Sequence, residues 1–230
     1  MKRFVFFVLV MGIAMSISAQ TMAPQFMPSS SVKVPEYTFA SGSWRFTDSR
    51  LYQNDAKAGL AKVNFKVPQS GIMQYQFNVR YEGGAEDGHG GFGIHIFVDS
   101  ALNRASWGAG KSWLLWLNYD EKPLSKDIPV GLSAQIYRSI NNSQMELISS
   151  VPLTGFEPFL TEENLAYPIT FRIIANGDTG EVRIYDPTDP DNRKYYLFFI
   201  DKKDLPLKGN YVALRTNGIK LSFALEDAGK

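Results

Sequence analysis

The stretch that decides the fold is GIMQYQFNVRYE, Gly71 to Glu82, in which apolar and polar residues alternate. One parity carries Met73, Tyr75, Phe77, Val79 and Tyr81, and the other carries Gln74, Gln76, Asn78, Arg80 and Glu82. Successive side chains of a β-strand point to opposite faces of the sheet. The alternation therefore predicts a half-buried strand with one apolar face and one polar face.

The same period continues through the rest of the chain. In FGIHIFVD, we expect Phe92, Ile94, Ile96 and Val98 to face one way and Gly93, His95, Phe97 and Asp99 the other. Further strands are predicted at 112–120, 131–140, 145–151, 169–175, 181–186, 194–201, 210–216 and 219–227, separated by turn signals such as Asn217-Gly218. Short helical turns are expected at 157–164 and 202–205.

About a dozen short, evenly spaced strands favour an all-β fold of two antiparallel sheets packed face to face, a β-sandwich of the jelly-roll kind. A barrel is the alternative. We find no internal repeat and no second domain, so residues 41–230 are interpreted as one β-sandwich domain, which this length can accommodate.

The first residues have the pattern of a secretory signal peptide: a basic Lys2-Arg3, an apolar run from Phe4 to Met15, and a small Ala19. We expect residues 1–19 to be removed, residues 20–40 to form an extended leader, and the protein to be exported to the periplasm or the extracellular space. The apolar run is shorter than the ~20 residues that a membrane span needs.

The composition of the chain excludes some kinds of site and disfavours some kinds of partner. The chain contains no cysteine, which excludes disulfides and thiolate metal sites. Without Lys2 and Arg3, its 24 basic residues become 22 against 23 acidic residues, so the mature protein is near neutral. Nothing in this balance favours binding to nucleic acid or to an anionic membrane.

Three segments together resemble the concanavalin A-like lectin/glucanase sandwich, including its laminin-G-like branch. They are the Trp-x-Phe start at Trp44, the Leu-Tyr-Gln strand at Leu51, and the closing Gly-x-Tyr-Val-Ala-Leu hairpin at Gly209. The resemblance covers most of 43–227 and implies a β-sandwich. It leaves the activity open, because that sandwich hosts enzymes, lectins and structural modules.

Two motifs suggest chemistry that their context does not support. WGAGKSW, Trp107 to Trp113, contains Gly-Lys-Ser, but Ala105 stands where a phosphate-binding loop needs glycine. The residues that follow alternate like a strand rather than a helix, so no nucleotide is expected. His89 and His95 share strand parity without a known zinc spacing to Glu86, Asp87 or Asp99. We interpret His89 as part of a turn in which Gly88, Gly90 and Gly91 permit positive φ.

Hydrolysis of a glycosidic bond requires two carboxylates that flank it. The Glu-x-Asp-x-(x)-Glu strand of the glucanase branch is absent, and Glu82, Glu86 and Asp87 lie at a strand end and in a turn. We therefore predict that the protein is not an enzyme and has no cofactor. A calcium site at Asp186, Asp189 and Asp191 is the alternative to a simple turn, because carboxylates in a loop are what Ca²⁺ prefers.

The polar faces of the strands remain as a candidate site. The expected ligand-binding residues are Gln76, Asn78, Arg80, His95, Trp116, Asn118, Gln135, Tyr137 and Arg172. Planar hydrogen-bonding side chains beside aromatic rings suit sugars, although an ordinary solvated sheet face has a similar composition.

The sequence thus predicts an exported, non-catalytic, lectin-like module that binds a glycan or another envelope ligand. The alternative is a structural or interaction protein of a periplasmic assembly, for example one associated with a flagellar-filament sheath. A glycoside hydrolase is a third hypothesis.

Overall fold

The computed structural model describes residues 35–47, 50–153, 169–186, 189, 191 and 193–224. The expected signal peptide, most of the expected leader and the helical turn predicted at 157–164 lie outside these residues. No helix within the described part of the chain is long and apolar enough to span a membrane. The predicted turn at 202–205 is present as a 3-10 helix, Lys202–Asp204.

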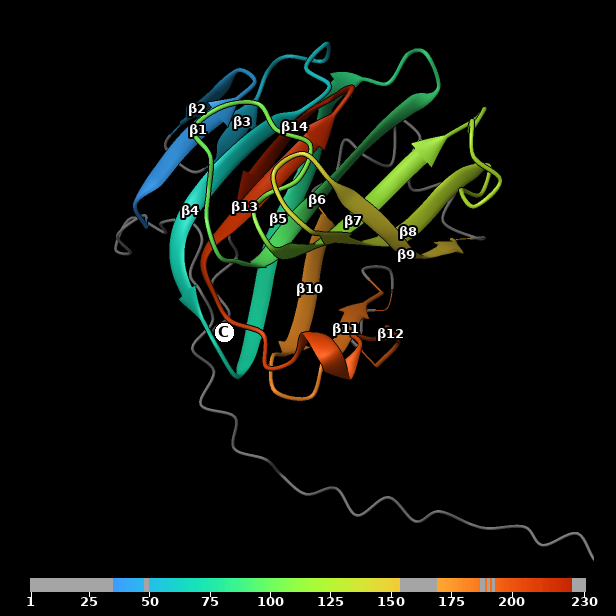
Figure 1. The fold of residues 1–230 in the computed structure, drawn as a ribbon. Coiled ribbons are helices and arrows are strands. Elements are labelled where there is room, and N and C mark those ends of the chain that lie inside the picture. The colour runs from blue at the N-terminus through green and yellow to red at the C-terminus, as the bar shows by residue number, and fades with distance from the viewer. Residues whose placement is uncertain are drawn as a thin grey trace, which may run out of the picture.

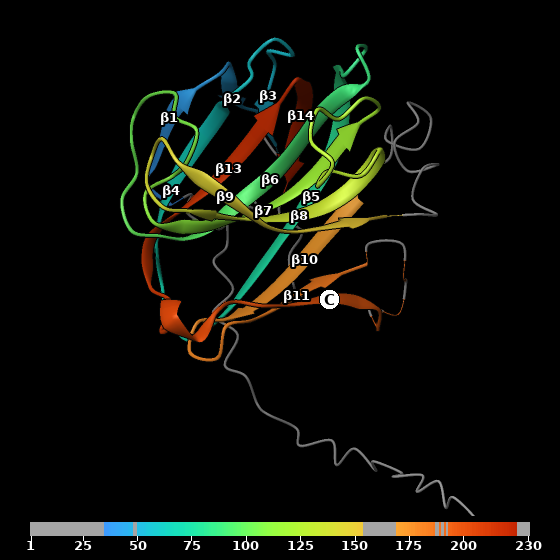
Figure 2. The same cartoon turned by 45° about the vertical axis from the view of Figure 1, so that its right-hand side comes forward.

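The described residues form two antiparallel sheets of seven strands each, and Figures 1 and 2 show the sheets as stacked layers. The first sheet contains, in spatial order, β1 (Tyr37–Ser41), β4 (Ala61–Gln69), β13 (Gly209–Asn217), β6 (His89–Val98), β7 (Ser112–Asp120), β8 (Gly131–Ser139) and β9 (Met145–Pro152). The second sheet contains β12 (Tyr195–Phe199), β11 (Glu181–Tyr185), β10 (Ile169–Asn176), β5 (Ile72–Gly84), β14 (Ile219–Ala224), β3 (Leu51–Gln53) and β2 (Trp44–Phe46). The predicted β-sandwich is confirmed, and the barrel alternative is wrong because no pairing among the described strands joins the two sheets. The last residues of the expected leader, 37–40, belong to strand β1.

The chain crosses repeatedly between the layers. The expected closing hairpin is one such crossing: β13 pairs with β4 and β6, whereas β14 pairs with β3 and β5. Gly218, with a φ of 68°, turns the chain over the end of the sandwich instead of folding it back within one sheet. The hairpin prediction was wrong because a sequence shows a turn but not the sheet that receives the next strand.

The apolar parity of each strand fills the space between the sheets, as predicted for Gly71–Glu82. Met73, Tyr75, Phe77 and Val79 are all buried in the central core. Four phenylalanines bridge the layers: Phe92 of the first sheet lies 5.3 Å from Phe171 and 6.4 Å from Phe223 of the second. Phe77 packs on the same two rings, with centroids 5.8 and 6.3 Å away.

A β-bulge reverses the predicted parity at the end of β6. Between the pairs His95–Ala213 and Val98–Tyr211, strand β6 has two residues, Ile96 and Phe97, whereas β13 has one, Val212. Phe97 has a φ of 53°. As a result Phe97, and not Val98, joins Ile96 in the central core. A bulge inserts one residue and so shifts every later side chain to the opposite face, which strict alternation cannot reveal.

Gln69 stabilises this bulge. Its Oε1 atom accepts the Phe97 backbone N–H at 2.8 Å and the Tyr75 hydroxyl at 2.6 Å, and its Nε2 atom donates to the Tyr211 carbonyl at 2.5 Å. One amide therefore provides the hydrogen-bond partner of all three groups. Gln69 is only 3% exposed, so water does not replace it easily.

Replacement of Gln69 by Met should therefore lower the free energy of unfolding by about 2–5 kcal/mol, because it leaves the Phe97 N–H and the Tyr75 hydroxyl buried without partners. Urea denaturation measures the change. The control is Gln74→Met, on the half-exposed polar face of β5, which should change stability by no more than about 0.5 kcal/mol. Equal losses in the two variants would contradict the bridging role of Gln69.

Candidate functional site

The nine predicted ligand-binding residues do not share one surface. Four lie on the outer face of the second sheet, namely Gln76, Asn78, Arg80 and Arg172. Five lie on the outer face of the first sheet, namely His95, Trp116, Asn118, Gln135 and Tyr137. The two outer faces point in opposite directions, so a single ligand contacts one group or the other.

The polar residues on the second sheet form hydrogen bonds and ion pairs with other residues of the protein. The Arg80 guanidinium forms an ion pair with Glu82 at 2.8 Å and donates to the Tyr52 hydroxyl at 3.1 Å. Arg50, which was not predicted, donates to the Asn78 side chain at 2.9 Å and to Ser222 Oγ at 2.7 Å.

The other two residues of this group have similar partners. The Arg172 guanidinium lies over the Tyr185 ring at 4.2 Å, and Gln76 accepts a hydrogen bond from Gln74 at 3.4 Å. These contacts satisfy most polar groups of this face, although the Nε atom of Arg172 is buried without a hydrogen-bond partner.

The group on the first sheet is covered rather than solvated. In the strand register, Trp116 lies beside Gln135 and Gly93, while His95 lies one row away, in the same row as Tyr137. His95 is 0% exposed and Gln135 is 1% exposed, although both point to the outer side of the sheet. Tyr137 is half-buried.

The cover is the loop between β6 and β7, residues 99–111, which crosses this face in Figures 1 and 2. Lys62 of β4 holds it: Nζ donates to the carbonyls of Ser106 and Gly108 at 2.9 and 2.6 Å and to Ser106 Oγ at 2.8 Å. Asn64 donates to the Leu102 carbonyl at 2.9 Å.

Arg215 of β13 completes the attachment. Its Nη1 atom donates to the Trp107 carbonyl at 2.7 Å, and its guanidinium carbon lies 4.7 Å from the Trp107 ring and 5.5 Å from the Trp116 ring. Arg215 is 2% exposed, whereas the Trp107 indole is 47% exposed at the surface above it. We define the outer cluster as Lys62, Asn64, His95, Trp116, Gln135 and Arg215.

Two glycines allow Trp116 to lie flat on the sheet. A Cβ atom on Gly91 would lie 2.5 Å from the indole carbon Cζ2, and one on Gly93 would lie 2.9 Å from Cε3. The turn predicted at Gly88, Gly90 and Gly91 is only partly present. Gly88 has positive φ, whereas Gly90 and Gly91 belong to strand β6 and do not, so the expectation was wrong for these two. The indole N–H donates to Asn118 Oδ1 at 3.0 Å.

Several polar atoms of this face are buried without a hydrogen-bond partner. They are Asn64 Oδ1, His95 Nε2, Asn118 Nδ2 and Arg215 Nε, together with Ser150 Oγ on the neighbouring strand β9. His95 uses only its Nδ1 atom, 3.0 Å from Ser112 Oγ. Buried polar atoms in proteins almost always have a protein group or an ordered water as partner, so this concentration sets the outer cluster apart within the described structure.

The electrostatics of the outer cluster are positive. Burial, and then the nearby Arg215, lowers the pKa of Lys62 from 10.5 to about 7, and burial lowers the pKa of Arg215 to about 10. Burial, followed by the charges of Lys62 and Arg215, holds the pKa of His95 well below 6.5, so His95 is neutral at pH 7. Among the described ion pairs, no carboxylate contacts Lys62 or Arg215.

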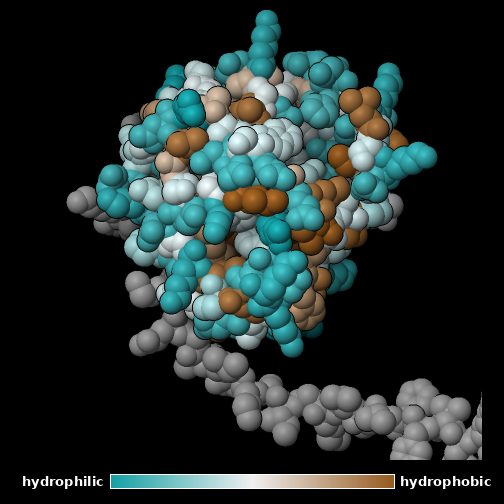
Figure 3. Space-filling view, in the orientation of Figure 1, coloured by the Kyte–Doolittle hydropathy of each residue, from teal (hydrophilic) through white to brown (hydrophobic). Residues whose placement is uncertain are grey.

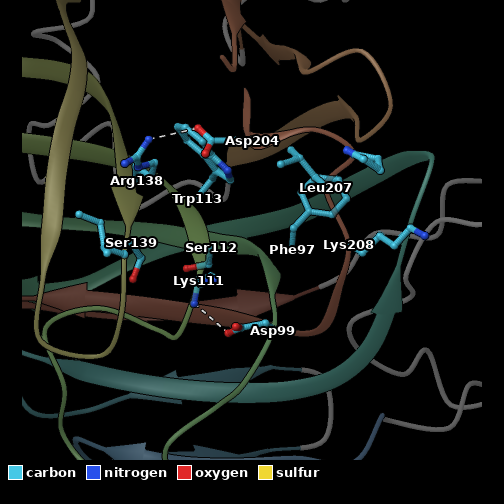
Figure 4. Close-up of a pocket in the computed structure, with 12 residues that line it drawn as sticks. Phe97, Asp99, Lys111, Ser112, Trp113, Arg138, Ser139, Asp204, Leu207 and Lys208 are labelled. Carbon is cyan, nitrogen blue, oxygen red and sulfur yellow. Dashed lines mark hydrogen bonds and ion pairs between the residues drawn. The ribbon is translucent and has the colours of Figure 1, made fainter. Parts of the chain in front are cut away.

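A groove at one end of the sandwich is a second concave feature, with a volume of about 340 Å³ (Figure 4). Phe97, Trp113 and Leu207 supply its apolar wall. The Arg138 guanidinium closes one side through an ion pair with Asp204 at 3.2 Å.

Sequence reasoning did not predict Arg138. The signal that could have found it is a charged residue in the inward-facing series Leu132, Ala134, Ile136 of β8. By contrast, nothing in the alternation around Lys62 and Arg215 distinguishes them from solvated residues.

The expected metal alternatives gain no support from the geometry. In the described part of the chain, no three His, Cys, Asp or Glu side chains gather as metal ligands would. His89 is exposed and His95 is fully buried. The Asp189 carboxylate accepts the backbone N–H groups of Asp191, Arg193 and Lys194 at 2.7–3.2 Å, which is the role of an aspartate that closes a turn.

Comparison with known proteins places the fold. No protein-family model and no curated protein matches the sequence. Among solved structures, a protein of unknown function with a galectin-like fold from Bacillus subtilis matches with a TM-score of 0.53 and 12% identity, over 83% of this chain and 87% of that chain. A legume lectin-like domain from Entamoeba histolytica (TM-score 0.49, 11% identity, 82% of this chain and 86% of that chain) also matches. So does a lectin from Bauhinia forficata in complex with GalNAc (TM-score 0.48, 13% identity, 86% and 95%).

The first of these matches confirms that the chain has a galectin-like sandwich, which is a concanavalin A-like fold. At this identity the likeness concerns the fold alone, and the ligand has to be argued from the side chains.

The charge on Lys62 makes stability depend on pH. Its folded pKa of about 7 lies below the ordinary 10.5, so between these values the unfolded chain binds more protons and stability rises with pH. The difference in unfolding free energy between wild type and Lys62→Met should therefore grow from pH 7 to pH 10, by at most ~1.4 kcal/mol per pH unit.

Urea denaturation at several pH values measures this difference. The matched control is Lys66→Met, on the same strand, since Lys66 is exposed and paired with Glu36 at 2.9 Å. Its difference from wild type should show no such rise. Parallel curves for Lys62→Met and wild type would contradict the lowered pKa of Lys62.

Proposed function

We propose that the protein is an exported, non-catalytic, lectin-like module that binds a carbohydrate on the outer face of its first sheet. The binding surface consists of Trp107 and Tyr137 around the buried Arg215. The observation that carries the proposal is Arg215 itself, whose guanidinium lies 4.7 and 5.5 Å from two tryptophan rings and whose Nε atom has no partner, like other polar atoms of this face.

The hydroxyl groups and the flat ring faces of a sugar are complementary to the polar atoms and the indole of this face. Sugar hydroxyls both donate and accept hydrogen bonds, so one ligand type suits acceptors such as Asn64 Oδ1 and donors such as Arg215 Nε. Because both atoms are buried under the loop 99–111, the proposal requires this loop to move aside when the sugar binds. The flat apolar side of a sugar ring stacks on an aromatic face, and Trp107 presents a half-exposed indole. Binding sites of this kind combine aromatic walls with a few polar groups that fix orientation.

The arrangement supports binding rather than hydrolysis. The outer cluster contains cations, amides and a histidine but no carboxylate, whereas glycoside hydrolysis requires two. The predicted acids are elsewhere: Glu82 is paired with Arg80, and the exposed Glu86 and Asp87 line a cavity of about 460 Å³ at the other end of the sandwich.

The alternative function is a structural or interaction role in a periplasmic assembly, such as a flagellar-filament sheath. Exposed apolar side chains favour it, among them Tyr195, Leu197 and Phe199 on strand β12. Export itself is part of both proposals. Amino-terminal sequencing of the protein recovered outside the cytoplasm should begin near Gln20, and a chain that retains Met1 inside the cell would overturn it.

Binding to a glycan array tests the carbohydrate proposal. Wild-type protein should give a specific signal, and Trp107→Ala should weaken binding at least about tenfold, which corresponds to ~1.4 kcal/mol. Leu124→Ala is the control, because Leu124 is a fully exposed apolar loop residue outside the site and its loss should leave binding unchanged.

Trp116→Ala should also abolish the signal, with thermal unfolding recorded to show that the variant is folded. Silence of the wild type across the whole array would refute the carbohydrate proposal and favour the alternative.

The non-catalytic part of the proposal has its own test. Incubation with β-glucans should release no reducing sugar. Any hydrolysis that disappears in Glu82→Gln or Glu86→Gln would establish the hydrolase hypothesis instead.

A further inference from the structure

Strand β12 is an edge of the second sheet with an apolar outer stripe. Its side chains alternate between half-buried and exposed: Tyr196 and Phe198 pack inward, while Tyr195, Leu197 and Phe199 are 43%, 46% and 68% exposed. One neighbour only, β11, pairs with it in the described structure. Aromatic and aliphatic side chains thus line an unpaired edge.

The other three edges carry features that oppose pairing with a further strand. Strand β9 contains Glu146, Pro152 and a bulge at Ile148. Strand β1 has an irregular register between Phe39 and Ser41, and β2 is only three residues long. Strand β12 has a regular register, no proline and no charge.

The free backbone groups of β12 belong to the same residues as the exposed stripe. The hydrogen bonds to β11 at its two ends come from even positions: the Lys194 carbonyl accepts from Asp186, and the Ile200 N–H donates to Gly180. In an antiparallel ladder the groups of every second residue face one neighbour. The N–H and C=O groups of residues 195, 197 and 199 therefore point away from β11.

We propose that β12 pairs antiparallel with β12 of a second copy of this chain, in a register centred on Leu197. This register places Tyr195 opposite Phe199 of the other copy, and Leu197 opposite its equivalent. All three pairs consist of residues with outward backbone groups, so each exchanges two hydrogen bonds. The cross-strand aromatic pairs add a packing contribution.

Charge at the two ends of the strand is complementary in the same register. Arg193 of each copy lies opposite Asp201 of the other. In the single chain the ion pairs of these residues are exposed, Arg193 with Asp191 at 3.8 Å and Asp201 with Lys203 at 3.2 Å, and Asp201 also accepts the Lys203 backbone N–H at 3.1 Å. Exposed pairs contribute little, so they leave both residues available for the interface. A register shifted by two residues would lose this match.

Sedimentation velocity over a concentration series tests the pairing. The wild-type protein should dissociate from dimer to monomer on dilution, and Leu197→Lys should be a monomer at every concentration, because it places two like charges directly opposite each other. The matched control is Ile148→Lys, an apolar residue that is 45% exposed on the edge strand of the other sheet, and it should remain dimeric. A wild-type monomer at all concentrations would overturn the proposal, as would dissociation of both variants.

Two further variants test the register. Arg193→Asp and Asp201→Arg should each weaken the dimer at least about tenfold, ~1.4 kcal/mol, and the double variant should recover it. Since the chain has no cysteine, Leu197→Cys should also form a disulfide-linked dimer on oxidation, whereas Ile148→Cys should not. No recovery in the double variant, or equal cross-linking at both positions, would refute this register.

Discussion

The edge-on packing of Phe92 against Phe171 and Phe223, which also contact Phe77, is the contact on which the rest of the molecule depends. It joins the two sheets through rings whose centroids lie 5.3–6.4 Å apart. Once these rings are buried, the side-chain parity of each strand is determined, because a slip by one residue would bring the polar set into the core. The outer faces, the edges and the loops that cover them all follow from that choice.

The polar side chains of the two outer faces obtain their hydrogen-bond partners in different ways. On the second sheet, Arg80 pairs with Glu82, and Arg50 donates to Asn78 and Ser222. On the first sheet, the loop 99–111 covers the polar side chains, and the buried Lys62 and Arg215 hold it through its carbonyl groups. Burial of two cations is costly unless they are well hydrogen-bonded. That cost, and the greater number of unpartnered polar atoms here, are the reasons why we propose this face as the ligand site.

The proposed carbohydrate surface and the proposed β12 interface lie on different sheets. Pairing at β12 would join the second sheets of two copies into one continuous layer, so both first sheets would face the same side. Two ligand surfaces would then be available to one glycan-bearing surface, and such bivalent binding strengthens weak individual contacts without any new contact. Each proposal nevertheless stands on its own observations.

The sequence by itself determined most of the strands and their buried parity, but it did not predict β1 and β4. Alternation in segments such as 112–120 and 145–151 predicted β7 and most of β9 within a residue, because a strand with one face in the core needs apolar residues at every second position. It also indicated the sandwich fold and the inward direction of Tyr75 and Phe77.

Only the tertiary structure decided which strands share a sheet and which polar residues meet. Lys62, His95 and Arg215 come from three separate strands, and their contact depends on the order β4-β13-β6, which periodicity does not contain. The bulge at Phe97 and the loop over Arg215 are likewise long-range features. Local alternation reports whether a side chain faces the core, but the strand order sets its neighbours, and a covering loop sets whether an outward side chain meets water.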